Sequence, residues 1–442
     1  MFSFASALRF VCLTGLSMLG GTASAVLLEL RVESVEPFVD GKAFGEAGPY
    51  ERIVATARGE LDPADPRDAV IELLDAAPRN ERGLVTYETD VVILAPVGGS
   101  EVLLYDVTNR GSKVGLGLMN DVGFLRGASG DPYTREVGNG FLLERGYALV
   151  WSGWDPTVPE RPDAMRATLP VALVNGLPVE GRVRDEFTFG IFPAEVPPSA
   201  RLSYSALRDR PAALSVRQRE RDVPRELAAT DWEWVDDEHI ALRKGDFEPA
   251  ALYDFRYTAA GPPVLGMGFA ITRDLVSFLR NDAKDAAGRP NPLRGRDSPR
   301  PRFALGMGVS QAGRFLRHFV ELGMNQDVRG RRVFDGLLPY ISGIGKVFAN
   351  HAFGQPGRTA GQHIGRLFPE NWYPFAYAAV RDPLTGGNAG LLRGDGFDPK
   401  ILEVNTESQT NPSLVEKDPY FKGWLYRILP TDPESDMQWL SL

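Results

Sequence analysis

Cysteine is almost absent from this chain of 442 residues, and histidine is scarce. The single cysteine, Cys12, lies within the first 25 residues, and there are four histidines in all. We expect the leading segment to be removed, which leaves a protein without disulfides, thiol chemistry or cysteine-ligated metal. No histidine and aspartate spacing typical of a metal site occurs either. The sequence therefore predicts no metal and no cofactor, and packing alone must stabilise the fold.

Clustered positive charge is also missing. The formal net charge is -9, with acidic and basic residues interleaved, 43% hydrophobic and 24% charged residues. A nucleic-acid-binding face would need a basic cluster, so we expect no nucleic-acid partner. The composition is that of an ordinary globular protein. The length exceeds what one modest core serves, which predicts a main domain with a sizeable insertion.

No hydrophobic run is long enough for a stable membrane span. Arg9 precedes an apolar run over residues 10–19, and Ala-Ser-Ala stands at 23–25. A span needs about 20 apolar residues, whereas a positive charge, a short apolar run and small residues are typical of a secretory signal. Residues 1–25 are predicted to be a signal peptide, and the protein to be exported, periplasmic or secreted.

The remaining chain alternates between two patterns. Residues 26–160 begin with short alternating runs separated by Gly, Pro and Asp, which indicate strands, and continue into a strand, turn, helix and strand rhythm. Residues 161–258 show only short alternating runs and are predicted to form a β-rich insertion. The α/β rhythm resumes over 259–442, where we expect the polar tail from residue 426 to end without a final core strand.

The strongest motif is GMGVSQAGRF at residues 306–315. A serine hydroxyl is a weak nucleophile, so a fold that uses one holds it on a sharp turn between a strand and a helix, with small residues two before and two after it. Gly308 and Ala312 meet that need around Ser310, an apolar strand precedes it and an amphipathic helix follows. Such a turn aims the N–H of Gln311 and the helix dipole at a forming oxyanion. A plain helix cap is the alternative reading of Ser310.

At this point the sequence resembles a family of large exported proteins known as α/β hydrolase domain-containing proteins. The resemblance rests on AFGEAGPYERI, NRGSK, LLERGYALVWSGWD, GMGFAITRDLVSFLR, GVSQAGRFLRHFVELGMNQD and RRVFDGLLPYISG, and covers residues 27–405. It implies an α/β-hydrolase-type, mostly parallel sheet with flanking helices. It also implies that Ser310 is the nucleophile and that the loop with Arg110 and Gly111 supplies the second oxyanion N–H.

The base and the acid depart from the family pattern. A serine nucleophile needs a histidine, oriented by a carboxylate, in the order Ser, acid, His, yet no histidine follows residue 363. His351 and His363, in the loop after the strand near residue 340, remain candidates for the base. Glu407 is the first candidate for the acid.

Asp382 and Asp335 are further candidates for the acid. His239 is expected to be a surface or strand residue, and His318 is expected to be a packing residue. An aromatic cluster at 368–380 is expected either to cover an apolar pocket or to pack in the core. The motif around Ser310 and the lack of a histidine after residue 363 leave two possible functions. One is a serine esterase that cleaves a small carboxylic ester through an acyl-enzyme, and the other is a catalytically incomplete relative that binds a ligand or carbohydrate.

Overall fold

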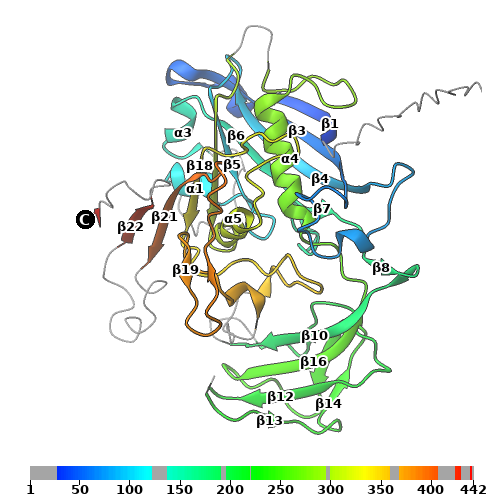
Figure 1. Cartoon of the computed structure of the whole chain (residues 1–442). Coiled ribbons are helices and arrows are strands. Elements are labelled where there is room, and N and C mark those ends of the chain that lie inside the picture. The colour runs from blue at the N-terminus through cyan, green and yellow to red at the C-terminus, as the bar shows by residue number, and fades with distance from the viewer. Residues whose placement is uncertain are drawn as a thin grey trace, which may run out of the picture.

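The computed structural model describes residues 27–121, 137–190, 196–219, 221–294, 299–358, 368–406, 424–429 and 439–440. A large mixed sheet runs through the molecule in the order β1-β3-β4-β6-β5-β17-β18-β21-β22-β23 (Figure 1). Two short strands lie off this path, because β2 pairs with β3 and β7 pairs with β4. Its strands are β1 Leu27–Pro37, β2 Ala43–Phe44, β3 Gly48–Leu61, β4 Val85–Pro96, β5 Val102–Asp106, β6 Ala148–Ser152, β7 Ala167–Thr168, β17 Phe303–Val309, β18 Gly336–Tyr340, β21 Lys400–Thr406, β22 Trp424–Leu429 and β23 Trp439–Leu440.

The centre of the sheet is parallel and its flanks are antiparallel. Strands β6, β5, β17, β18 and β21 pair in parallel, whereas β1, β3 and β4 form antiparallel pairs at one side and β22 at the other. The expectation of a mostly parallel sheet thus holds only for the centre. The β-rich N-terminal segment adds its long strands directly to the sheet, because an antiparallel pair needs only a short connection.

The strand β22 also corrects an expectation. The tail was predicted to contribute no further core strand, but residues 424–429 pair with β21 through six residue partners. The sequence WLYRIL there is rich in aromatic and branched residues, which suit a strand. The sheet therefore continues beyond β21.

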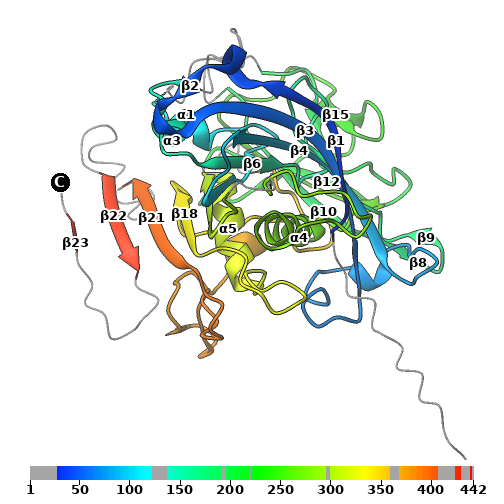
Figure 2. The same ribbon diagram turned by 90° about the horizontal axis from the view of Figure 1, so that it is seen from above.

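Two apolar layers cover the faces of the sheet. In β5, Leu103 and Tyr105 join one buried cluster while Leu104 joins the other, because successive side chains of a strand point to opposite faces. The helices are α1 Gly115–Met119, α3 Phe141–Glu144, α4 Met267–Asn281 and α5 Gln311–Glu321. Figure 2 shows α4 and α5 side by side on one face, where Phe269 and Phe315 stack with ring centroids 4.5 Å apart.

In the helix α4, residues from Met267 to Leu279 are all buried. Its charged residues are accommodated by ion pairs. Arg273 lies 2.8 Å from both Asp68 and Asp274. A wholly buried helix must pair such charges internally.

A separate β-rich unit lies below the main sheet in Figure 1. Within its described residues it has a four-stranded sheet, β10-β16-β12-β13, and a three-stranded sheet, β11-β15-β14, with an apolar cluster of its own. These strands and the remaining small ones are β8 Leu173–Val174, β9 Leu177–Pro178, β10 Glu180–Phe187, β11 Ala200–Arg201, β12 Ala213–Arg217, β13 Arg225–Glu226, β14 Trp232–Trp234, β15 His239–Leu242, β16 Leu252–Ala260, β19 Val380–Arg381 and β20 Asn388–Ala389. The β-rich character expected for residues 161–258 is present; the exact domain limits stay a prediction.

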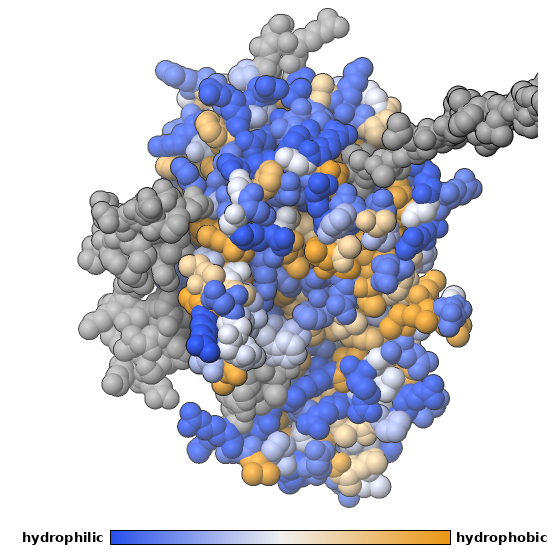
Figure 3. All heavy atoms as spheres, in the orientation of Figure 1, coloured by the Kyte–Doolittle hydropathy of each residue, from blue (hydrophilic) through white to orange (hydrophobic). Residues whose placement is uncertain are grey.

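The surface carries mostly polar groups. Figure 3 shows hydrophilic residues over much of the visible face, with apolar residues interspersed. Among the described residues, no helix combines the length and the apolar character needed to cross a bilayer.

Candidate active site

Ser310 stands at a strained turn between β17 and α5. Its backbone angles are φ 56° and ψ −112°, a region that a serine rarely adopts. The turn is held on both sides, because the Ser310 amide donates to the Tyr340 carbonyl at 2.8 Å and the Arg314 amide donates to the Ser310 carbonyl at 3.0 Å. Strain at such a position is typical of functional sites. This is the strand, turn and helix geometry that presents a nucleophilic serine.

The turn closes only because its neighbours are small. A Cβ atom on Gly308 would collide with the carbonyl oxygen of Ala312, and one on Gly313 would lie 2.9 Å from the carbonyl oxygen of Gly308. The need for small residues at positions 308 and 312 was predicted from the sequence. The need for Gly313 was not foreseen, although its place directly after Ala312 in the motif could have indicated it.

The Gln311 side chain ties two distant segments to this turn. Its Oε1 accepts the Arg110 amide at 3.0 Å, and its Nε2 donates to the Pro356 carbonyl at 2.6 Å. Asn109 adds a second link, because its Nδ2 donates to the Val309 carbonyl at 2.6 Å. The loop with Arg110 and Gly111 therefore lies against the turn that carries Ser310. The motif predicted a role for the backbone amide of Gln311, but it gave no signal for these side-chain bonds to Arg110 and Pro356.

The backbone of that loop is itself constrained. Arg110 and Gly111 both have positive φ angles, 48° and 77°. Arg161 fixes the loop from outside, since its Nη2 donates to the Arg110 carbonyl at 2.6 Å and to Ser112 Oγ at 2.8 Å. Because the Arg110 amide is engaged by Gln311, the Gly111 amide is the one of the two with no hydrogen bond among the described residues.

His318 is a packing residue, as expected. Its Nδ1 lies 2.9 Å from the Val347 carbonyl oxygen, and its ring packs against Phe269 with centroids 5.0 Å apart. Burial lowers the pKa of His318 to about 3, so the imidazole stays neutral. It lies two turns along α5 from Ser310.

In the described part of the chain, no histidine is joined to the serine. His351 follows β18 and packs against Phe348, with ring centroids 5.5 Å apart. Burial lowers the pKa of His351, and the Glu72 carboxylate raises it. Among the described residues, no histidine nitrogen forms a hydrogen bond with the Ser310 hydroxyl. His363 lies outside the described residues, and the partly exposed His239 at the start of β15 pairs with Asp236 at 2.9 Å.

The candidate acids fall into different places. Glu407 lies outside the described residues. Asp335 precedes β18, and its Oδ2 accepts the Ala304 amide at the start of β17, which is the end of these parallel strands opposite Ser310. Asp382 caps a turn by accepting the amides of Leu384 and Thr385, both at 3.1 Å.

A further carboxylate, Glu403, is buried on β21 near the edge that carries Ser310. Its Oε2 pairs with Arg317 at 2.8 Å, and its Oε1 accepts Ser342 Oγ at 2.9 Å and Asn405 Nδ2 at 2.7 Å. These partners come from α5, from the loop after β18 and from β21 itself. Glu403 is therefore fully engaged in holding α5, the loop after β18 and β21 together.

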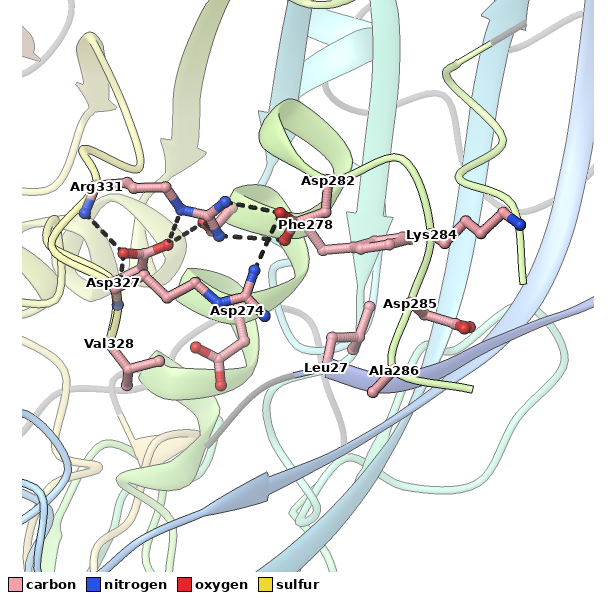
Figure 4. Close-up of a pocket in the computed structure, with 12 residues that line it drawn as sticks. Leu27, Asp274, Phe278, Asp282, Lys284, Asp285, Ala286, Asp327, Val328 and Arg331 are labelled. Atoms are coloured by element: carbon pink, nitrogen blue, oxygen red, sulfur yellow. Dashed lines mark hydrogen bonds and ion pairs between the residues drawn. The ribbon is translucent and has the colours of Figure 1, made fainter. Parts of the chain in front are cut away.

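The pocket in Figure 4 is remote from this chemistry. It lies where α4 ends, and the ion pairs of Arg331 with Asp327 at 2.6 Å and with Asp282 at 2.7 Å cross it. Ser310 does not line it. Within the part of the chain that the structure describes, no group of histidine, cysteine, aspartate and glutamate side chains is arranged to hold a metal ion.

Comparison with known proteins agrees with this geometry. Residues 222–418 match a family model described as an alpha/beta hydrolase domain, and this segment contains β17, Ser310, α5, β18 and β21. Residues 222–418 are therefore similar to an α/β hydrolase domain.

Shorter similarities concern a different kind of protein. A glycine cleavage system H protein 5 of Aquifex aeolicus is 47% identical over 38 residues, which cover 9% of this chain and 26% of that protein. A glycine cleavage system H protein of Acinetobacter baumannii is 50% identical over 30 residues (7% and 24%), and one of Bacteroides thetaiotaomicron is 52% identical over 33 residues (8% and 26%). The chain thus spans about a quarter of the length of these curated relatives.

Proposed function

We propose that this chain is a serine hydrolase that cleaves a carboxylic ester through an acyl-enzyme on Ser310. The observation that carries the proposal is the strained backbone of Ser310, with φ 56° and ψ −112°, at the turn from β17 into α5. A helix cap needs no such strain, because capping serines adopt ordinary extended angles. In this structure Ser310 also makes no side-chain capping bond to α5.

The reaction follows from the groups around that turn. The Ser310 Oγ attacks the ester carbonyl carbon while a base takes its proton, and the carbonyl oxygen becomes an oxyanion. The Gln311 amide in the first turn of α5 and the Gly111 amide are suited to donate to that oxyanion. Arg110 can donate only if the Gln311 side chain releases its amide. The alcohol then leaves, and water hydrolyses the acyl-enzyme.

We assign the base to the loop after β18, with His351 first and His363 as the alternative. Loops at the carboxyl ends of parallel strands surround the ligand crevice of such sheets. His351 would need to reorient, because its ring now packs against Phe348; catalytic hydrogen bonds are often absent before substrate binds. Glu407, directly after β21, is the proposed acid. The export of the protein, directed by residues 1–25, also belongs to this proposal.

The experiment is turnover of p-nitrophenyl acetate by the purified protein beside Ser310→Ala. We expect hydrolysis by the parent and a loss of at least about a thousandfold in the variant. His351→Gln and His363→Gln, assayed on the same substrate, identify the base. Equal rates for the parent and Ser310→Ala would reject the proposal.

A second candidate is a catalytically incomplete relative that binds a ligand or carbohydrate. It is favoured by one observation, the absence of a histidine bonded to the Ser310 hydroxyl among the described residues. It predicts ligand binding without turnover, and no difference between the parent and Ser310→Ala in the ester assay.

A further inference from the structure

Arg314 lies on the same face of α5 as the serine. It is the fourth residue after Ser310, and its amide donates to the Ser310 carbonyl at 3.0 Å; residues four apart on a helix are neighbours on its surface. The Arg314 Nε donates to the Ser342 carbonyl at 2.9 Å, and Ser342 belongs to the loop that follows β18. One end of the guanidinium is thus fixed beside the edge of the sheet that carries Ser310.

One nitrogen at the other end of this guanidinium is unsatisfied. Its Nη1 is closed off from solvent and has no hydrogen-bond acceptor, and among the described residues Arg314 forms no ion pair. The neighbouring arginines differ. Arg317 pairs with Glu403 at 2.8 Å, and Arg358 pairs with Glu370 at 2.5 Å. A buried donor without an acceptor is unfavourable, so the position needs a functional reason.

The charge of Arg314 is also poorly compensated. Burial lowers the pKa of its guanidinium, the Glu370 carboxylate raises it, and the guanidinium of Arg110 is the first of three that lower it. Arginine nevertheless remains protonated in proteins. Arg314 is therefore a fixed positive charge, half-buried, one helical turn from the nucleophile.

We propose that Arg314 binds a carboxylate of the substrate, so that the esters this protein prefers carry one free carboxylate group. The proposal rests on the proposed ester hydrolysis at Ser310. With Nε engaged by Ser342 and Nη1 without an acceptor, the planar guanidinium keeps donor geometry that matches the oxygens of a carboxylate. A single charge fits better than a dianionic phosphate, because the Glu370 carboxylate already lies close enough to Arg314 to raise the pKa of its guanidinium.

The test measures binding separately from turnover. Ser310→Ala protein is titrated calorimetrically with monomethyl succinate and with its neutral match, dimethyl succinate. We expect the monoester to bind at least tenfold more tightly. Adding Arg314→Met should remove that preference, whereas Arg201→Met, an exposed arginine of the β-rich unit, should leave it unchanged. Arg314→Lys keeps the charge without the planar donor geometry and should lower the preference at least threefold.

Equal binding of the two esters by Ser310→Ala would overturn the proposal, as would a preference that survives Arg314→Met or is unaltered in Arg314→Lys. The lysine variant decides the matter if the methionine variant does not fold, which thermal unfolding reports. Ester turnover by the parent protein is measured in parallel. Turnover without a carboxylate preference rejects only the role of Arg314, while a carboxylate preference without turnover rejects only the hydrolase.

Discussion

Gly308 and Ala312 touch across the turn that presents Ser310. The carbonyl oxygen of Ala312 occupies the space that a Cβ on Gly308 would need, so the strained angles of Ser310 depend on the absence of a side chain two residues earlier. This makes the turn a rigid element whose geometry is set by local sequence. The strain remains because the bonds to Tyr340 and from Arg314 hold the serine on both sides.

Replacing Gly308 by valine tests this dependence. The new side chain overpacks the turn, so we expect a loss of about 1–3 kcal/mol in unfolding free energy and loss of any reactivity of Ser310. Urea unfolding measures the stability. Gly98→Ala is the matched control, because a Cβ there meets no atom within 4 Å; an equally stable Gly308→Val variant would show that the turn is not held this way.

The Gln311 side chain is a second residue whose role is positional. It bonds to the Arg110 amide and to the Pro356 carbonyl, and each such bond contributes about 0.5–1.5 kcal/mol. Gln311→Met should lower ester turnover about tenfold or more by loosening the loop that carries Arg110 and Gly111. The Glu side chain in Gln311→Glu still accepts a hydrogen bond from the Arg110 amide but cannot donate one to the Pro356 carbonyl. The ester turnover of this variant should therefore lie between that of the parent and that of Gln311→Met. Equal rates for all three proteins would contradict a positioning role.

At the scale of elements, α5 combines an end that borders Ser310 with a buried core. Its first residue contacts the loop with Arg110 and Gly111, while Phe315 and Phe319 are fully buried and His318 packs against Phe269 on α4. Burial keeps His318 neutral, with a pKa of about 3. The packing of α5 against α4 is therefore sensitive to acid.

The pH dependence of stability tests this element. Below pH 6.5 the unfolded chain protonates His318 and the folded protein does not, so stability falls as the pH falls, by about 1.4 kcal/mol per pH unit. Between pH 6.5 and 5, His318→Gln should therefore lose about 2 kcal/mol less than the parent. Unfolding by urea at the two pH values measures this difference. A His318→Gln variant that follows the parent would contradict the assignment.

The sequence was most informative where a pattern was local. The strand before Ser310, the turn and the helix after it were all predicted, because strand periodicity, small residues and helix periodicity occur within 20 residues. The bonds from Gln311 to residues 110 and 356, and the free end of Arg314, join segments far apart in the chain and have no local signal. The full burial of α4 has no local signal either, since Arg273 pairs with the distant Asp68 only in the folded state.

At the scale of the whole molecule, one loop joins the main sheet to the β-rich unit. Phe353, from the loop after β18, belongs to the apolar cluster of that unit and packs against Tyr204 with ring centroids 5.2 Å apart. The same loop carries Pro356, which Gln311 bonds, and His351. The arrangement connects the packing of the β-rich unit with the segment that is proposed to hold the base.

Phe353→Ala tests this connection. Removing a buried phenylalanine should lower the stability by about 3–5 kcal/mol, and we expect ester turnover to fall with it because the loop is less well held. Thermal unfolding and turnover are measured on the same samples. Val223→Ala, at a side chain that is 90% exposed, should change neither; normal turnover by Phe353→Ala would show that the loop holds its place without this contact.

The most direct measurement of the central claim is labelling of the purified protein with a fluorophosphonate probe, followed by mass-spectrometric mapping of the labelled residue, beside Ser310→Ala. A fluorophosphonate reacts with serines whose hydroxyl is activated by a neighbouring base. We expect a single adduct on Ser310 that is absent from the variant. An unlabelled protein, or an adduct that persists in Ser310→Ala, would contradict it.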